Sequence, residues 1–201
     1  MEPGFGIRHP AIESLLDTLP PAVAVEETSW FDGAMPLRVS AHLGERELPA
    51  PLVSSVRCIV HVDDKIVVCT TPDGADPWPG GRRERGESYW HTARREVYEE
   101  TGWLLRADAF EMIGWLHFEC LCALPDDHPY PHPDFLQVVY AGVGEQRAAP
   151  VDAAWVDADE WVQSSRLLHP AAAEEIVVAP CAKPFLQTIA QLTPRPHTPP
   201  A

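Results

Sequence analysis

The chain has 201 residues, of which 45% are apolar and 22% charged, so we expect one folded domain with extensions. Its 30 acidic side chains oppose 15 Lys and Arg, and this net charge of −15 disfavours broad binding to nucleic-acid backbones while leaving a small nucleotide open as a partner. No apolar run reaches the roughly 18 residues of a membrane span, no secretory signal is recognisable, and the five cysteines are widely spaced, so we expect reduced thiols in a cytoplasmic protein.

Residues 1–52 are expected to form an N-terminal extension without a chemical motif. Apolar residues recur at helical spacing over 11–19, and Pro20 and Pro21 stop that helix. Residues 37–48 read as two short strands around Gly44. We expect an added packing layer here, with a homodimer-forming arm as the alternative, because exposed strand edges readily pair.

The main domain is expected over residues 53–192. Alternation of apolar and polar residues predicts strands, and clusters of proline, glycine and aspartate predict the turns between them. The expected elements are strands over 56–62 and 65–70, a loop over 71–79, one or two strands within 110–123 and a strand over 136–143. Residues 193–201, TPRPHTPPA, are expected to be a disordered tail.

Between the second strand and the third lies the most informative segment, residues 80–103, GGRRERGESYWHTARREVYEETGW. Ser88 can cap a helix and Gly102 can end it in the left-handed conformation. Trp90, Ala93, Val97 and Thr101 recur at steps of three and four residues and predict a buried stripe.

Three carboxylates lie beside that stripe. Glu96, Glu99 and Glu100 fall within an arc of roughly 100° on the helix, where like charges repel and destabilise. A bound divalent cation would reverse that penalty. Because all the ligands would be oxygen atoms, the pattern predicts Mg²⁺ or Mn²⁺ as the cofactor.

The segment resembles the Nudix box in its order of Gly81, Glu87, Arg95-Glu96, Glu99-Glu100 and Gly102. Trp103 departs from the pattern, because an aliphatic residue is usual there. The resemblance implies an α/β/α sandwich with a mixed sheet over about residues 53–192. It also implies that residues 153–161 form a strand and turn before a last helix over 174–192, which Pro180 and Pro184 interrupt.

The resemblance further implies a hydrolase that cleaves a pyrophosphate linkage in a nucleoside diphosphate derivative. The Gly80 carbonyl and the carboxylates of Glu96, Glu99 and Glu100 would be metal ligands, and Glu96 would also activate the attacking water. Glu87 would pair with Arg95 and thereby hold Glu96 in position.

Substrate contacts are expected outside the carboxylates. Arg82, Arg83 and Arg85 would contact phosphates or neutralise the nearby glutamates. Trp78 would pack under the glycine loop or stack on a base. The proline-rich loop over residues 124–135 contains Tyr130, a candidate for stacking, and Asp127, one of three candidates for a further catalytic carboxylate; its alternative is a solvated loop.

Three alternatives stay open at this point. The first is a zinc site at Cys120, Cys122, His128 and His132, although the two cysteines lie one residue closer than in common structural sites. The second is a non-catalytic nucleotide-binding regulatory module on the same fold. The third is isomerisation of an isoprenoid diphosphate, which needs a cysteine and a glutamate facing each other in the pocket.

Overall fold

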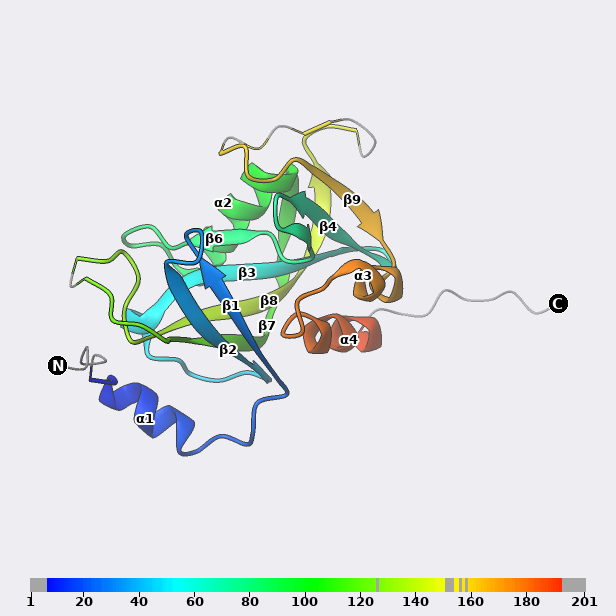
Figure 1. Ribbon diagram of the computed structural model, residues 1–201. Helices are drawn as coiled ribbons and strands as arrows, with labels where there is room; N and C mark the ends of the chain where they lie inside the picture. Colours follow the sequence, from blue (N-terminus) through cyan, green and yellow to red (C-terminus); the bar gives the residue numbers. More distant parts are fainter. Residues whose placement is uncertain (1–6, 126, 151–153, 156, 158, 193–201) are drawn as a thin grey trace.

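The computed structural model describes residues 7–125, 127–150, 154, 155, 157 and 159–192. Within them a mixed sheet lies between helices, which confirms the expected α/β/α architecture (Figure 1). The elements are α1 Pro10–Leu16, β1 Ala24–Trp30, β2 Met35–Leu43, β3 Val53–Val62, β4 Lys65–Thr71, β5 Gly74–Asp76, β6 Gly80–Arg82, α2 Tyr89–Thr101, β7 Trp103–Cys120, β8 Asp134–Arg147, β9 Ser164–Leu168, α3 Pro170–Ile176 and α4 Lys183–Leu192.

The described strands form one sheet in the order β1-β2-β7-β8-β3-β4-β5, with β6 paired to β3 and β9 paired to β4. The β3–β8 pairing is parallel, whereas the other pairings are antiparallel. The central strand β3 contains no exposed residue, and β8 is exposed only near its end, at Glu145 and Gln146, as expected of strands covered on both faces.

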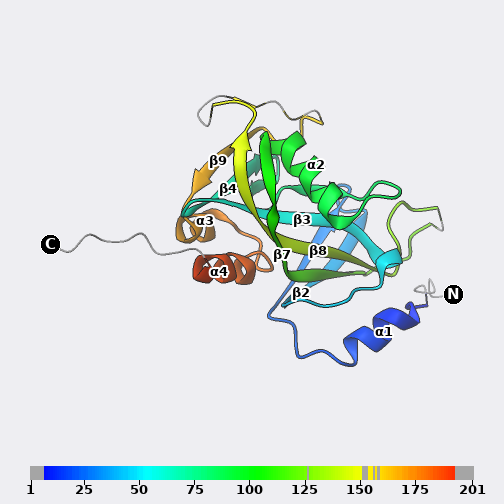
Figure 2. The same cartoon turned by 180° about the vertical axis from the view of Figure 1, so that it is seen from behind.

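Each face of the sheet supports a separate apolar cluster, because successive side chains of a strand point to opposite faces. On one face, Val56 and Cys58 of β3 pack with Ala93 and Val97 of α2. On the other, Ile59 packs with residues of α3 and α4. Helix α2 and the α3–α4 pair therefore lie on opposite sides of the sheet (Figures 1 and 2).

The N-terminal extension adds two strands to this sheet, at positions that differ from the prediction. Residues 44–49 contain no strand; instead β1 and β2 form a hairpin whose turn includes Phe31, Asp32 and Gly33 at positive φ. The strand β1 was missed because Glu26 and Glu27 break its apolar pattern. It lies at the edge of the sheet, and its pairing with a second copy of the chain stays a prediction.

Ion pairs fasten the start of the described chain to the sheet. Arg8 donates from Nε to Asp134 Oδ2 at 3.0 Å and from Nη2 to Glu119 Oε1 at 2.6 Å. The other Asp134 oxygen lies 2.6 Å from His117 Nε2, and these two side chains are buried. Helix α1 packs beside this network through Ile12 and Leu15, which are also buried.

Two predictions for the C-terminal half hold only in part. Of the strand and turn predicted over 153–161, the described residues form a turn, in which the Glu160 N–H donates to the Asp157 carbonyl at 3.1 Å, but no strand. Residues 153, 156 and 158 lie outside the described residues, and the strand β9 begins at Ser164. The Trp155 indole instead donates to the Glu99 carbonyl at 2.8 Å, and Asp157 accepts from the Val162 N–H at 2.8 Å. The last helix is interrupted, as predicted, and residues 177–182, which include Pro180, separate α3 from α4. Pro184 does not interrupt a helix, because it lies in the first turn of α4, where its missing N–H costs nothing.

The prediction of a disordered tail over residues 193–201 lies outside the described residues. Of the helices in the described part of the chain, none combines the length and apolar character that a membrane crossing needs.

Gly102 should be sensitive to substitution for two separable reasons. Its φ is 74°, and a Cβ atom would lie 2.7 Å from Trp155 Cε3. We expect Gly102→Ala to lower the free energy of unfolding by about 1–3 kcal/mol, measured by urea denaturation. Gly86→Ala is the control, because its φ is 89° but no atom lies within 4 Å of the added methyl. Equal losses in the two variants would contradict a role for the Trp155 contact.

Candidate active site

Helix α2 forms as the sequence predicts. The Ser88 side chain accepts from the His91 N–H at 3.2 Å, and Gly102 ends the helix in the left-handed region. Ala93, Val97 and Thr101 are buried, as is Thr92, which the prediction did not include. Trp90 is half-buried and packs edge-on against Phe110. The buried stripe fixes the rotation of the helix and turns its glutamates toward β6.

Two consecutive glycines bring strand β6 close to those glutamates. A Cβ atom on Gly81 would lie 2.5 Å from Glu96 Oε1, so only glycine allows the carboxylate its present position. The Gly80 N–H donates to Glu100 Oε2 at 3.2 Å. Glu96 and Glu100 therefore meet at one backbone corner, which we call the glycine corner, Gly80-Gly81.

Arg95 binds the carboxylates on one side of this corner. Its Nε and Nη2 donate to the two oxygens of Glu87 at 2.9 and 3.0 Å, which is a bidentate pair. Its Nη1 donates to Glu96 Oε1 at 2.8 Å and to Glu99 Oε2 at 3.1 Å. The Arg82 carbonyl accepts a further bond from Nη2 at 3.1 Å. The predicted Glu87–Arg95 pair is thus present, and it reaches Glu96.

The carboxylates differ in their affinity for protons. Hydrogen bonds from Arg95 lower the pKa of Glu87 to about 2. Burial raises the pKa of Glu96, although Arg95 opposes the rise. Burial raises the pKa of Glu100 to about 8, and Arg57 counters part of that effect. Two carboxylates at the glycine corner are therefore costly to ionise without a compensating cation.

Arg57 is the site residue that the sequence analysis missed. It lies on β3 opposite Gly80, and its Nη1 donates to the Gly80 carbonyl at 2.7 Å. Its charge opposes the pKa rise of Glu100 and of the neighbouring Asp76. A lone arginine in the apolar run of residues 56–60 was the signal that could have found it.

Glu99 occupies a different position from the other two glutamates of the helix. Its side chain is 43% exposed and pairs with Arg95. No group of three or more His, Cys, Asp and Glu side chains in the described part of the chain is gathered closely enough to hold a metal ion. Glu96 and Glu100 share the corner, whereas Glu99 lies beside it.

The predicted substrate contacts fall into two groups. Arg83 lies over the Tyr89 ring at 4.7 Å and donates to the Glu87 carbonyl, so it serves the local structure. Trp78 packs edge-on against Phe185 in the core, as the packing alternative expected. Arg82, by contrast, is exposed and lies 5.7 Å from the centre of the Tyr130 ring. Asp127 is exposed on the proline-rich loop.

The zinc alternative gains no support from the described residues, since they contain no suitable group of ligands. Cys120 is buried in the core, and burial raises the pKa of its thiol to about 11. His128 and His132 each direct Nδ1 at the backbone of Tyr130.

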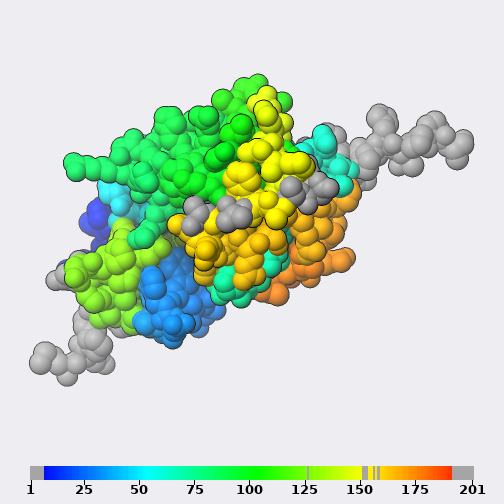
Figure 3. Space-filling view, turned by 90° about the horizontal axis from the view of Figure 1, so that it is seen from above, coloured from blue at the N-terminus to red at the C-terminus, as the bar shows by residue number. Residues whose placement is uncertain are grey.

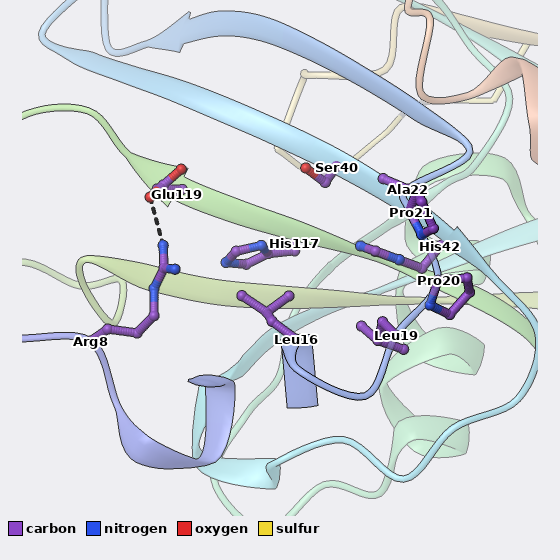
Figure 4. A pocket seen from close by; sticks show the side chains of 10 residues that line it. All are labelled: Arg8, Leu16, Leu19, Pro20, Pro21, Ala22, Ser40, His42, His117 and Glu119. Carbon is purple, nitrogen blue, oxygen red and sulfur yellow. Dashed lines mark hydrogen bonds and ion pairs between the residues drawn. The ribbon is translucent and has the colours of Figure 1, made fainter. Parts of the chain in front are cut away.

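A separate pocket of about 440 Å³ lies between the N-terminal segment and strands β2 and β7. His42, His117 and Ser40 face it from the sheet, and leucine and proline side chains of residues 16–21 form the opposite wall (Figure 4). The His42 ring stacks on Trp115 at 4.3 Å, and burial lowers the pKa of this histidine. The pocket lining includes none of the carboxylates at the glycine corner.

Comparison with known proteins gives a family and a fold. The NUDIX domain family model matches residues 51–181. The chain is similar to a mutant of the pyrophosphohydrolase BsRppH from Bacillus subtilis, with 16% identity, a TM-score of 0.50, and coverage of 84% of this chain and 94% of that chain. It is also similar to a NUDIX hydrolase from Nitrosomonas europaea, with 18% identity, a TM-score of 0.49, and coverage of 72% and 93%. No curated protein matches the sequence.

The Glu87–Arg95 pair should make stability depend on acid pH. Because the pKa of Glu87 is about 2 in the folded protein against an ordinary 4.5, its contribution is complete above about pH 4.5 and is lost as the pH falls toward 2. We expect Glu87→Gln to lower the free energy of unfolding by about 1–3 kcal/mol at pH 7, as for hydrogen bonds to charged groups.

Urea denaturation from pH 7 to pH 2 tests this, and the difference between wild type and Glu87→Gln should shrink below about pH 4.5. Glu84→Gln is the control, because Glu84 is 70% exposed and lies 4.0 Å from Arg95 Nε. A difference that stayed constant down to pH 2 would rule out the charged pair as its cause.

Proposed function

We infer the reaction of this protein from its family: the chain belongs to the Nudix hydrolases, pyrophosphohydrolases that act on nucleotide derivatives. We propose that it cleaves the pyrophosphate linkage of a nucleotide or nucleotide conjugate in the presence of Mg²⁺ or Mn²⁺. The observation that carries this proposal is the meeting of Glu96 and Glu100 at the glycine corner, with Arg95 fixing one of them.

The residues at the corner fit a hard divalent cation. Burial raises the pKa of both Glu96 and Glu100, so their joint ionisation calls for added positive charge. The donors available are oxygen atoms, which suit Mg²⁺ or Mn²⁺. Glu96, Glu99, Glu100 and the Gly80 carbonyl would hold the ion. When bound, it would neutralise charge on the phosphate oxygens and orient the linkage for attack.

Glu96 is the proposed general base. Arg95 holds one of its oxygens at 2.8 Å, and the carboxylate is confined against Gly81. Burial raises its pKa, and a carboxylate of higher pKa is a stronger base toward the water proton. In the proposed step a water oxygen bonds to phosphorus, the bridging P–O bond breaks, Glu96 accepts the water proton, and the leaving phosphate keeps the bond electrons.

Glu87 and Arg95 act through Glu96 as positioning residues. The bidentate bond between them anchors the guanidinium that holds Glu96. Arg82 is the proposed phosphate contact, because it is exposed and directly follows the glycine corner. Tyr130 is the proposed stacking partner for a base, whereas Trp78 packs against Phe185 in the core and is not assigned a substrate contact. Asp127 stays a candidate for the additional carboxylate.

The isomerase alternative needs a cysteine that faces a glutamate in the pocket, and Cys69, which lies near Glu100, does not meet that need. The Cys69 thiol lies near enough to Glu100 for that carboxylate to raise its pKa, but burial dominates the rise. Cys69 packs in the same cluster as Val67 and Val97. A thiol enclosed in the core is not presented to a diphosphate substrate.

The reaction is tested by incubating the protein with a panel of nucleotides and nucleotide conjugates and Mg²⁺ or Mn²⁺. Phosphomonoester products are detected by coupling to a phosphatase. We expect Glu100→Gln to lower kcat more than about a hundredfold, which is more than a residue outside the metal's own ligands contributes. Mg²⁺ or Mn²⁺ should raise the Tm of wild type but not of this variant.

Glu145→Gln is the control, because Glu145 is exposed on β8 away from the corner. Without metal, Glu100→Gln should be at least as stable as wild type above pH 8. Because the pKa of Glu100 is raised in the folded protein, its protonated form stabilises the fold. That stabilisation is complete below about pH 4.5 and is lost as the pH rises through about 8. Wild-type turnover by Glu100→Gln would disprove its assignment as a ligand.

Gly81→Ala tests the confinement of Glu96 without changing a charge. The added methyl would overlap the carboxylate, so Glu96 must move. We expect kcat to fall about a hundredfold, as for a displacement of about 1 Å in a catalytic group, with little change in Tm. Gly44→Ala is the control, because it adds a methyl at a strained glycine with nothing within 4 Å. An unchanged kcat in Gly81→Ala would mean that Glu96 is not confined there.

A further inference from the structure

Tyr130 belongs to an aromatic cluster that two distant parts of the chain build together. Its ring centre lies 5.3 Å from that of Trp30, 6.5 Å from that of Phe31 and 5.0 Å from that of Phe135. Trp30 and Phe31 come from the β1–β2 hairpin, whereas Tyr130 and Phe135 come from the proline-rich loop and the start of β8. The hairpin and the loop lie next to each other in Figure 3, where they are blue and yellow-green.

Phe31 is the part of this cluster that solvent reaches. Its side chain is 57% exposed, although the neighbouring Trp30 packs against Phe118 and Phe135. Both Phe31 and Asp32 have a φ of 54°, a conformation that residues with side chains seldom adopt. The turn therefore holds a large apolar ring in water in a strained conformation. Such outliers cluster at ligand contacts more than elsewhere.

The aromatic cluster adjoins the glycine corner through Arg82. The Arg82 guanidinium lies over the Tyr130 ring at 5.7 Å. Its own backbone follows Gly81, against which Glu96 is confined, and its carbonyl accepts from Arg95. A ligand whose phosphates meet Arg82 therefore has an aromatic surface beside it, made by Tyr130 and Phe31.

The hairpin is held firmly enough to serve as a wall. Strand β2 pairs with β7 from Leu37↔Cys120 to Leu43↔Gly114, so the hairpin is continuous with the sheet that supports the site. Phe31 also meets the His128 ring edge-on at 5.9 Å. The hairpin precedes residue 51, where the match to the family model begins.

We propose that the tip of the β1–β2 hairpin, through Phe31, forms with Tyr130 a stacking wall for the base of the substrate. This inference rests on the proposed function and adds Phe31, from the N-terminal extension, to the residues that would contact the nucleobase of the substrate. Every base has an aromatic face, so stacking alone accepts purines and pyrimidines alike and rejects diphosphates that have no base. The N-terminal extension thereby becomes part of the substrate site in addition to its packing role.

The test compares two hydrolysis-resistant probes by calorimetry with Mg²⁺: α,β-methylene-ADP, which has a base, and methylenediphosphonate, which has none. We expect Phe31→Ala to weaken binding of α,β-methylene-ADP about tenfold, within the range for one stacked base. Binding of methylenediphosphonate should not change. Phe31→Trp should retain the wild-type affinity for both probes, because it keeps a ring at the tip. Val25→Ala is the control, since it truncates an exposed apolar residue elsewhere on β1.

The outcomes separate the inference from the function beneath it. If Phe31→Ala binds α,β-methylene-ADP as wild type does, while wild type hydrolyses nucleotides with a requirement for Glu100, the stacking wall is refuted and the proposed function stands. An equal loss of affinity for both probes would also refute the stacking wall, because the hairpin tip would then affect the phosphate site and not the base. If wild type binds neither probe and hydrolyses no nucleotide, the proposed function fails and the wall fails with it.

Discussion

The bidentate bond between Arg95 and Glu87 is the contact on which the candidate site depends. It leaves Nη1 of the guanidinium free to hold Glu96 and Glu99, so one cation orders three carboxylates. Glycine at position 81 then limits where Glu96 can lie. Hydrogen bonds from Arg95 orient the Glu96 carboxylate, and the backbone at Gly81 limits how closely it can approach β6. Both are needed to fix the position of the proposed general base.

The charges at the corner are balanced only in part. Arg57 and Arg95 oppose the effect of burial, yet the pKa of Glu100 still rises to about 8. Carboxylates so costly to ionise support the proposal that a cation binds here, since a bound cation would lower that cost and stabilise the folded protein. Arg57 also occupies the Gly80 carbonyl, so the same oxygen that would bind an ion is satisfied in its absence.

The N-terminal extension has a proposed role at the site in addition to its place in the sheet. Its hairpin lengthens the sheet by pairing with β7, and the Arg8–Asp134–His117 network ties the preceding segment to β7 and β8. The hairpin shares the sheet with β7, and Trp30 and Phe31 contact Tyr130 of the proline-rich loop. In the proposed stacking wall, selectivity for a base arises far in sequence from the glutamate helix.

The sequence by itself determined helix α2, its cap at Ser88, its end at Gly102, the Glu87–Arg95 pair and the family, because these depend on local spacing and on residues close along the chain. It did not place β1, the start of α3 or Arg57, whose importance comes from pairing opposite Gly80. Only the tertiary structure separated Glu99 from the corner and joined Phe31 to Tyr130. Strand pairing brings residues a hundred positions apart into contact, and local patterns carry no record of such contacts.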